Sequence, residues 1–328
     1  MKRRLFLRNS ALAGMGLGMT GMYACSTPKK EGESKVELPE PYQPFFKLSL
    51  AQWSLHKAIF SKELSPLDFA MKAKGLGFEG LEYVNQLYAN ELKGGMSLEV
   101  LVKELNMRAS DNGVENLIMM VDLEPGVGDM AVTDDKTRTT AIEAHYPWVD
   151  ATAGLGCHSM RINMFGEFEA DAWKTASVDA LGRLGEYAAE RKVNIIIENH
   201  GWLTSNAALL MEVINEVNMA NVGTLPDFGN FCTKRKDMAR WGECEEEYDM
   251  YKGIKELMPA AKAVSAKSYD FDESGNETKI DYSRMLRIVK DAGYTGFIGV
   301  EYEGDRLSEE EGIIATRDLL INAAKELA

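Results

Sequence analysis

The sequence predicts an α/β protein whose main domain is a closed barrel of eight strand–helix units, a (β/α)8 fold. From residue 45 onward, short apolar runs alternate with amphipathic segments, and this alternation indicates a parallel sheet covered by helices. Eight such units in about 280 residues match the size of a closed barrel. Several amphipathic segments end in glycine just before the next apolar run, as helices often do. A doubly wound open sheet is the alternative.

The eight predicted strands have the short, nearly continuous apolar composition of strands that are buried on both faces. They are residues 46–54, 77–84, 115–122, 159–165, 193–199, 222–227, 263–268 and 297–303. Between them, apolar residues recur every three or four positions, as in helices that pack on a sheet. The clearest such segments are residues 65–77, 97–113, 178–192 and 282–293. The glycines of GLGFEG, residues 75–80, end a helix and precede a strand, which is the reverse of a dinucleotide-binding loop.

The N-terminus has the order of an export signal rather than of a folded domain. Residues 1–10 are basic, residues 11–24 are apolar and small, and Cys25 follows. Residues 3–8, RRLFLR, resemble the twin-arginine export motif, and residues 22–25 resemble a lipoprotein cleavage box. We therefore expect a signal peptide over 1–24, lipidation of Cys25, a polar linker over 25–44, and the barrel over 45–328. The expected location is periplasmic, on a bacterial membrane; the alternative is an uncleaved hydrophobic anchor.

The charge excludes some classes of partner. The chain carries a formal net charge of -14, from 37 basic and 51 acidic residues. Loss of residues 1–24 removes four basic residues and gives 33 minus 51, or -18. Such acidity argues against a nucleic-acid partner, and it leaves the lipid as the expected contact with a membrane. Cys157, Cys232 and Cys244 show no metal-binding spacing, and we expect free buried thiols, with a bond between Cys232 and Cys244 as the alternative.

Polar residues gather where the predicted strands end. In a barrel these ends meet at one face, which is where such enzymes hold their active sites. Because side chains two apart on a strand point the same way, Glu198 and His200 can share a face, as can Glu301 and Glu303. The polar strand-end residues are Gln52, Ser54, Glu82, Arg161, Asn163, Glu198, His200, Asp227, Asn230, Lys267, Glu301 and Glu303.

Three motifs carry a resemblance to a known family. IIENHG, LPDFGNF and GVEYEG, in this order, resemble the sugar phosphate isomerase/epimerase family, which are xylose isomerase-like TIM barrels. The resemblance covers roughly residues 46–326. It implies a divalent metal ion at the barrel mouth, held by Glu198, Asp227 and Glu301. It also implies that Glu198 and Glu301 act as the paired acid and base that move a proton between neighbouring sugar carbons.

The sequence departs from the family at the seventh strand. The resemblance implies a fourth metal ligand there, a histidine, but this chain has Ser265 and then Lys267. Two outcomes stay open. Oxygen ligands, with His200 or water completing the shell, favour Mn²⁺ or Mg²⁺ over Co²⁺ or Zn²⁺. In the other outcome, Lys267 neutralises the carboxylates and replaces the metal.

The remaining candidates are residues expected to contact a sugar. They are His200, Lys267, Glu82, Arg161, Asn230, His56 and Trp202. A structural role is the alternative for each; for Asp227 it is a helix cap, and for Glu198 and Glu301 a buried salt-bridge network. We expect His145 to be structural, and the acidic run 243–249 to be the solvated start of a helix.

The sequence thus predicts an exported, lipid-anchored carbohydrate isomerase or epimerase that moves a proton next to a carbonyl, with a homo-oligomer as a further option. No glycine-rich phosphate loop precedes a helix, so a neutral sugar or keto-sugar is the expected substrate. One alternative is a 3-keto-glycoside lyase or hydratase on the same site, and another is a tethered sugar-binding protein without catalysis. An endonuclease IV-like phosphodiesterase is disfavoured, because it needs a histidine-rich zinc site and a basic face, and this chain has four histidines.

Overall fold

The computed structural model describes residues 42–328, which form one compact unit. The predicted signal peptide, the lipidation at Cys25 and the linker as far as residue 41 lie outside the described residues. Within residues 42–328, no helix combines the length and the apolar content needed to cross a membrane.

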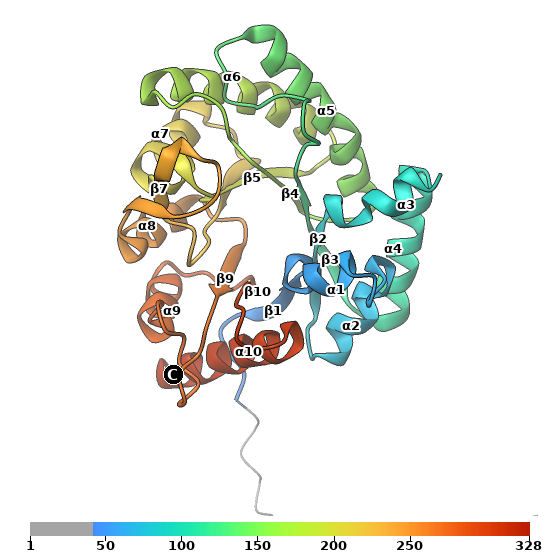
Figure 1. Cartoon of the computed structure of the whole chain (residues 1–328), viewed down its shortest axis with the longest axis vertical. Coiled ribbons are helices and arrows are strands. Elements are labelled where there is room, and N and C mark those ends of the chain that lie inside the picture. The colour runs from blue at the N-terminus through green and yellow to red at the C-terminus, as the bar shows by residue number, and fades with distance from the viewer. Residues whose placement is uncertain (1–41) are drawn as a thin grey trace, which may run out of the picture. The chain divides into compact units, whose positions relative to one another are not determined.

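The core of the fold is a parallel sheet of eight strands in the order β6-β5-β4-β3-β2-β1-β10-β9 (Figure 1). Each strand lies within one of the eight runs predicted from the sequence. The strands are β1 (Lys47–Ala51), β2 (Gly80–Val84), β3 (Glu115–Val121), β4 (Ser159–Ile162), β5 (Asn194–Glu198), β6 (Val222–Leu225), β9 (Val264–Ser268) and β10 (Phe297–Tyr302). The α/β barrel prediction is confirmed.

The sheet closes on itself between β6 and β9 through a short seam rather than a full ladder. Single parallel bridges join Thr224 to Ala261 and Asp227 to Ser265. The Ser265 amide donates to the Pro226 carbonyl, and the Phe228 amide donates to the Ser265 carbonyl. The seam therefore fixes Asp227 directly opposite Ser265, two residues that the sequence separates by a helix.

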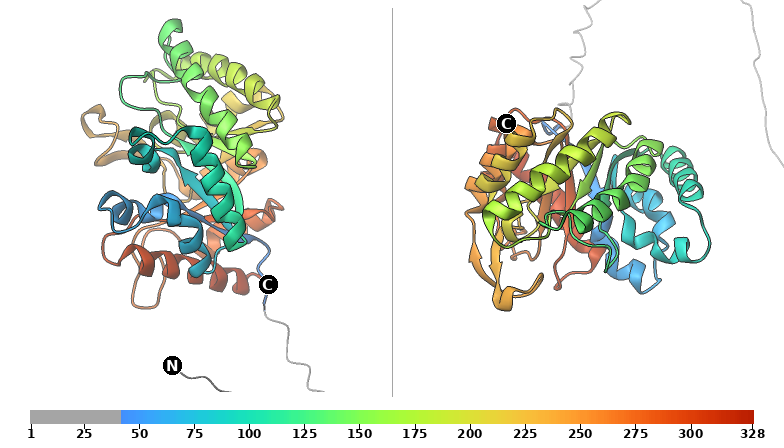
Figure 2. Two further views of the ribbon diagram at one scale, coloured as in Figure 1. Left: turned by 90° about the vertical axis from the view of Figure 1, so that its right-hand side faces the viewer. Right: turned by 90° about the horizontal axis from the view of Figure 1, so that it is seen from above.

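Helices surround the sheet, as two further views show (Figure 2). They are α1 (His56–Phe60), α2 (Phe69–Gly75), α3 (Ala89–Lys93), α4 (Leu98–Asn112), α5 (Asp135–Gly154), α6 (Ala170–Ala189), α7 (Ala207–Val217), α8 (Met250–Leu257), α9 (Tyr282–Asp291) and α10 (Glu309–Glu326). The expectation that helices end in glycine is met at α4, which ends at Gly113 in the left-handed conformation with φ 61°. GLGFEG is the end of α2, a turn and the start of β2, as predicted.

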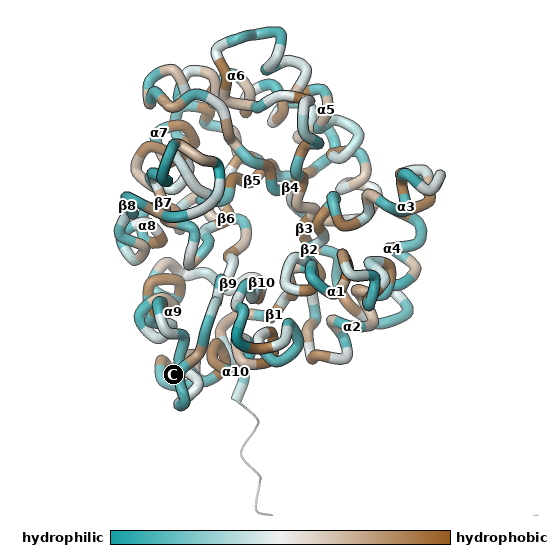
Figure 3. The backbone as a smooth tube through the Cα atoms, in the orientation of Figure 1, coloured by the Kyte–Doolittle hydropathy of each residue, from teal (hydrophilic) through white to brown (hydrophobic). Residues whose placement is uncertain are grey.

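The strands have an apolar composition because both of their faces are buried; Figure 3 colours the backbone by hydropathy, with hydrophobic residues in brown. Ile195, Ile196 and Ile197 of β5 are all fully buried. Since successive side chains of a strand point to opposite faces, both faces of β5 are covered. The barrel interior also contains a carboxyl group, that of Glu82, which is fully buried. It packs against Gly299 of β10, where a Cβ atom would lie 2.3 Å from Glu82 Oε1, so a larger residue there would require the Glu82 carboxyl group to move.

A two-stranded antiparallel hairpin, which the sequence analysis did not predict, follows β6. It pairs β7 (Cys232–Arg235) with β8 (Cys244–Glu247). The prediction that residues 243–249 start a helix is wrong for most of this run. The glutamates can form a strand because Lys234 Nζ lies 3.2 Å from Glu245 Oε2 and 3.1 Å from Glu246 Oε1. Only Asp249, which accepts from the Lys252 amide, caps α8.

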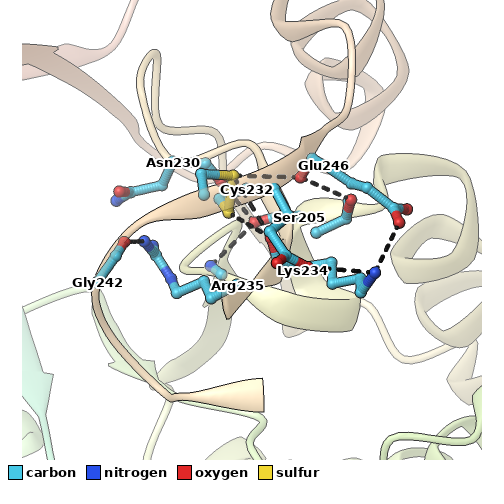
Figure 4. The surroundings of a disulfide bond; sticks show 11 residues. Ser205, Asn230, Cys232, Lys234, Arg235, Gly242 and Glu246 are labelled. Carbon is cyan, nitrogen blue, oxygen red and sulfur yellow. Dashed lines mark hydrogen bonds and ion pairs between the residues drawn. A yellow bond between two sulfur atoms is a disulfide. The ribbon is translucent and has the colours of Figure 1, made fainter. Parts of the chain in front are cut away.

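The hairpin is closed by a disulfide bond between Cys232 and Cys244 (Figure 4). The expectation of free thiols is therefore wrong for these two cysteines, whose positions on facing strands bring their Cα atoms to 5.8 Å. Cys157 is free and buried, as expected.

Candidate active site

A cavity of about 880 Å³ opens where the barrel strands end, and we refer to it as the main cavity. Segments at the carboxyl ends of all eight barrel strands, together with the hairpin, contribute to its lining. The polar lining residues include Asp122, Arg161, Asn163, His200, Asn230, Glu301 and Glu303. This is the face at which (β/α)8 barrels carry catalytic groups.

Three carboxylates converge next to this cavity. Glu198 ends β5, Asp227 follows β6 and Glu301 lies in β10. One oxygen atom of each lies within 4.8 Å of the other two, and all three side chains are buried. We refer to these residues as the acidic triad. The sequence-based prediction that these three residues meet at one point agrees with their position, while their roles remain a prediction.

The backbone around β5 and β6 sets the position of Asp227. The Asn199 side chain joins the two strand ends, because its amide group donates to the Asp227 carbonyl at 2.9 Å and its oxygen accepts from the Asp227 amide at 2.8 Å. Asp227 Oδ1 accepts from the amides of Gly229 and Asn230, each at 2.9 Å. These amides belong to a turn and not to a helix, so the helix-cap interpretation of Asp227 is wrong. Its second oxygen, Oδ2, makes neither of these hydrogen bonds and accepts from the Ser265 hydroxyl instead.

Two residues of β9 meet the triad from the opposite side of the seam. Ser265 takes the place of the family's histidine, and its hydroxyl lies 2.7 Å from Asp227 Oδ2 and 3.3 Å from Glu301 Oε2. Lys267 is buried as well, with its ammonium group 3.1 Å from Glu301 Oε2 and 3.2 Å from Glu303 Oε2. Ser265 thus contacts two carboxylates of the triad from the position at which the family resemblance implies a metal-binding histidine. Lys267 adds a positive charge beside them.

The pKa values show that burial and repulsion between like charges disfavour the ionised forms of the triad. Burial raises the pKa of Asp227 to about 8, against the lowering effect of Lys267 and with a further rise from the charges of Glu198 and Glu301. Burial also raises the pKa of Glu198 and of Glu301, although Arg161 and Lys267 oppose this for Glu198 and Lys267 opposes it for Glu301. The charge of each carboxylate therefore disfavours the ionised form of its neighbours.

The triad has the chemistry of a site for an oxygen-preferring divalent cation. Burial and mutual repulsion both raise the pKa values of these three carboxylates, and a bound cation would offset the repulsion between their negative charges. The Ser265 hydroxyl offers a fourth oxygen where the family has a nitrogen donor. Such an all-oxygen set suits Mg²⁺ or Mn²⁺ better than Zn²⁺.

Arg161 connects the triad to a second acidic group that the sequence analysis missed. Its Nε lies 3.0 Å from Glu198 Oε2, and its Nη1 donates to Asp122 Oδ1 at 3.0 Å. Burial pushes the pKa of Asp122 upward, but Arg161 and His200, with the hydrogen bonds from Arg161 and Asn163, hold it below its ordinary value. Asp122 follows β3 directly, so an acid at the end of an apolar run was the pattern that could have identified it.

His200 lines the main cavity as a neutral imidazole. Asn163 donates from its amide group to Asp122, which leaves its oxygen to accept from His200 Nδ1 at 2.8 Å. Nδ1 then carries the hydrogen and Nε2 is an acceptor. Burial, with the charges of Arg161 and Lys267, lowers the pKa of His200 to about 4, so the ring is uncharged at neutral pH. Its Nδ1 is committed to Asn163 and not to the acidic triad.

Four predicted sugar-binding residues do not line the main cavity: Lys267, which lies beside Glu301 of the acidic triad, and the three residues Glu82, His56 and Trp202. Glu82 is enclosed within the barrel, where Ser49 donates to it at 2.6 Å. His56 stacks on Trp53 with ring centroids 4.5 Å apart, so it supports a cavity residue rather than facing the cavity. Trp202 lines a separate cavity of about 200 Å³, which we refer to as the side cavity. Local strand position identified all three, but it could not show which way each side chain points.

The other predicted contacts lie in or next to the main cavity. Arg161, His200 and Asn230 line it, and Asn230 also donates to Glu198 Oε1 at 3.1 Å. Lys267 lies beneath, between Glu301 and Glu303. His145 is buried with Nδ1 2.8 Å from the Ala141 carbonyl, as its predicted structural role requires, although its edge also reaches the cavity.

The hairpin adds cavity residues that no strand-end pattern could indicate. Arg235, Arg240 and Trp241 all line the main cavity, and Arg240 also lines the side cavity together with Phe165. Arg240 pairs with Asp129 at 2.7 Å, so it spans from the hairpin to the segment after β3. The sequence analysis singled out only the acidic run 243–249, which follows these three residues.

The structure is thus a (β/α)8 barrel with three carboxylates converging at its mouth. Residues 71–323 match the family described as "Xylose isomerase-like TIM barrel". The match covers well over half of the chain, so the protein belongs to this family, and the resemblance drawn from the three sequence motifs is confirmed.

Two curated relatives match over short segments. The chain is 39% identical over 54 residues to the C-glycoside deglycosidase alpha subunit of Arthrobacter globiformis, which covers 16% of this chain and 15% of that protein. It is 44% identical over 48 residues to the 3'-dehydrocarminate deglycosidase alpha subunit of a Microbacterium species, covering 15% and 14%. The chain thus aligns with about one seventh of the length of either relative.

Solved structures of low sequence identity share the whole fold. An L-ribulose 3-epimerase superimposes with a TM-score of 0.64 at 15% identity, covering 86% of this chain and 97% of that one. A 3-keto-D-glucoside 4-epimerase from E. coli gives 0.63 at 13% identity, covering 84% and 99%. The IolI protein, solved with a bound zinc atom, gives 0.62 at 17% identity, covering 86% and 99%. At these identities the similarities show the shared fold.

Proposed function

We propose that the protein is an epimerase or isomerase that moves a proton next to a carbonyl of a sugar or keto-sugar. The observation that carries the proposal is the pair Glu198 and Glu301, buried together beside a cavity large enough for a sugar. Both carboxylates have raised pKa values, and a carboxylate with a raised pKa is a stronger base for a weakly acidic C–H bond.

The two glutamates divide the proton transfer between them. One carboxylate takes the proton from the carbon next to the carbonyl, and the other returns a proton to the opposite face or to the next carbon. Arg161 and Asn230 hold Glu198 in place, while Ser265 and Lys267 hold Glu301. Because all four supports come from barrel strands or from the turn after β6, the two carboxylates are fixed in direction before a substrate binds.

Other residues would bind and orient the sugar. The Nε2 atom of His200 is free of Asn163 and can accept a hydrogen bond from a hydroxyl group. Trp53, which donates to Glu303 Oε1 at 2.5 Å, offers an aromatic face on the β1 side of the main cavity. A neutral substrate suits a wall in which acidic groups outnumber basic ones near the triad.

A divalent cation fits the triad, with Glu198, Asp227, Glu301 and the Ser265 hydroxyl as its ligands. When bound, it would polarise the substrate carbonyl and stabilise the negative charge that develops on its oxygen. Mg²⁺ or Mn²⁺ suits this donor set. The Lys267 ammonium group, 3.1 Å from Glu301, supplies part of the same electrostatic effect from the chain itself.

A lyase acting on a 3-keto-glycoside is the second candidate function. The same base that removes a proton next to the 3-keto group would expel the substituent at the neighbouring β position. The short matches to two deglycosidase subunits favour this alternative, as does the fold shared with a 3-keto-D-glucoside 4-epimerase. An epimerase keeps the substrate mass, whereas elimination divides the substrate into two products.

The proposal includes export to the periplasm with a lipid on Cys25. Residues 1–24 have the order of an export signal, and the Cys232–Cys244 bond is of the kind that persists in oxidising compartments. Metabolic labelling with a fatty-acid analogue, compared between the wild type and Cys25→Ala, tests the lipidation. Labelling that survives Cys25→Ala contradicts it.

The test of the activity is solvent exchange. Purified protein (residues 26–328) with added Mg²⁺ or Mn²⁺ is incubated in D₂O with ketohexoses and with a 3-keto-glucoside, and the products are analysed by NMR and mass spectrometry. Deuterium at a carbon next to the carbonyl, in an isomer of unchanged connectivity, supports the epimerase. Two fragments from the 3-keto-glucoside support the lyase.

Matched variants connect the result to the site. Glu198→Gln and Glu301→Gln should each lower kcat by about 10²- to 10⁴-fold, because each removes one proton carrier. Glu326→Gln, at the exposed end of α10, is the control and should leave kcat unchanged. Substrate binding without exchange or cleavage in the wild type would favour a non-catalytic sugar-binding protein and refute the proposal.

A further inference from the structure

The outer wall of the main cavity is aromatic, in contrast to its acidic inner end. Trp241 of the hairpin and Phe165 after β4 meet edge to face with ring centroids 5.8 Å apart. The Trp241 ring also lies 5.0 Å from the His200 ring, which joins the aromatic wall to the polar part of the cavity. Trp241 is nevertheless 51% exposed, so a large apolar ring is left uncovered at the cavity mouth.

The hairpin holds this ring in a fixed place. The disulfide bond closes the hairpin at its base, and Arg235 donates to the Gly242 carbonyl at 2.6 Å across the loop that carries Trp241. The Arg240 guanidinium lies 4.4 Å from the centre of the Phe165 ring and pairs with Asp129. The hairpin is thus tied both to β4 and to the segment after β3. A half-exposed tryptophan anchored in this way beside a cavity can serve as a stacking surface for a ligand.

The size of the cavity points in the same direction. At about 880 Å³ it lies near the upper end of the range that holds drug-sized ligands, about 300–1,000 Å³. A single sugar ring placed against Glu198 and Glu301 occupies only the inner end. The space between the sugar ring and the Trp241 side chain is left for a second group attached to the sugar.

We infer that the aromatic wall formed by Trp241 and Phe165 is a subsite for the second group of a two-part glycoside, and that this group has a flat apolar face. The inference deepens the proposed function, because it rests on the sugar end of the ligand lying at the acidic triad. The Arg235 guanidinium lies over the Trp241 ring and the Arg240 guanidinium over the Phe165 ring, and such groups donate hydrogen bonds and stack on rings. Two aromatic rings with guanidinium groups stacked on them suit an aryl aglycone, which offers a flat face on both sides.

Binding measured by calorimetry tests the inference without any turnover. The probes are 4-nitrophenyl glucoside and methyl glucoside, each as both anomers, together with the disaccharides cellobiose and maltose. We expect one 4-nitrophenyl anomer to bind about tenfold more tightly than the matching methyl glucoside. Trp241→Ala should remove this preference, Trp241→Phe should keep most of it, and Met107→Ala, equally exposed on the outer face of α4, should leave it unchanged.

Each other outcome has a definite meaning. Equal binding of aryl and methyl glucosides by the wild type, or no binding of any probe, overturns the inference. Tighter binding of a disaccharide than of the aryl glucoside, lost in Trp241→Ala, keeps the flat-faced subsite and assigns it to a second sugar. A binding preference that depends on Trp241 in a protein without solvent exchange or cleavage activity supports the subsite and refutes only the proposed function.

Discussion

Replacing Glu82 by glutamine should make the protein more stable at alkaline pH. Glu82 is fully buried in the barrel, Ser49 donates to one of its oxygens, and Oε2 has no partner among the described residues. Burial raises the pKa of Glu82 to about 8, from an ordinary value of 4.5, while the Ser49 hydrogen bond opposes the rise and the charges of Glu301 and Glu198 add to it. The folded protein therefore holds a proton on Glu82 that the unfolded chain has already lost.

The sign and size of the effect follow from these two pKa values. Between pH 4.5 and about 8 the folded state binds one proton more than the unfolded state, so the free energy of unfolding falls as the pH rises. The slope is about 1.4 kcal/mol per pH unit, and over this span of about 3.5 pH units the loss approaches ~5 kcal/mol. Glu82→Gln keeps the shape of the side chain but cannot ionise, so it should remove this loss.

Urea unfolding of both proteins at pH 5, 7 and 9 measures the difference directly. Near pH 5 the two free energies of unfolding should be similar, and the advantage of the variant should then grow to several kcal/mol at pH 9. Ser308→Ala, which removes the exposed cap of α10, serves as a control because it should shift stability by a similar amount at every pH. A constant difference between wild type and Glu82→Gln from pH 5 to pH 9 would show that Glu82 is ionised in the folded protein, and the reasoning would fail.

Three further changes examine the site and the hairpin. Lys267→Met leaves the buried Glu301 without its partner, so the free energy of unfolding at neutral pH should fall by ~3–5 kcal/mol, and Mg²⁺ or Mn²⁺ should raise the melting temperature more in this variant than in the wild type. Ser265→His supplies the nitrogen donor of the family, and calorimetry should show Zn²⁺ binding about tenfold more tightly than in the wild type. Cys232→Ser combined with Cys244→Ser should speed tryptic cleavage within the hairpin about tenfold or more, with little change in melting temperature, because neither strand belongs to the barrel sheet.

Each of these expectations has an outcome that contradicts it. Equal gains from divalent cations in Lys267→Met and in the wild type would mean that Lys267 does not compete with an ion for the acidic triad, and no gain in either would mean that no ion binds there. Unchanged Zn²⁺ affinity in Ser265→His, with an intact circular dichroism spectrum, would place the metal elsewhere. Equal cleavage rates with and without the disulfide would show that other contacts hold the hairpin.

The strands and the two glutamates could be predicted because each depends on local sequence. A run such as Ile195–Ile197 has few alternatives to a buried strand, and the polar residue at its end must then lie at the barrel mouth. Glu198, Asp227 and Glu301 were identified in this way. Glu82, His56 and Trp202 were chosen by the same criterion, position at or just after a strand end, but they do not line the main cavity. Position along a strand does not determine whether a side chain there points into the barrel, away from it or toward the mouth.

By itself, the sequence determined the barrel, its family and the three residues of the acidic triad, because periodicity and strand-end position are properties of consecutive residues. Only the tertiary structure decided what surrounds the triad. The seam between β6 and β9 places Ser265 against Asp227, and the packing of β9 on β10 places Lys267 against Glu301. The hairpin with its disulfide and Trp241 was likewise hidden, because its strands are stabilised by each other and by distant loops, and contacts between residues far apart in the chain leave no periodic pattern in the sequence.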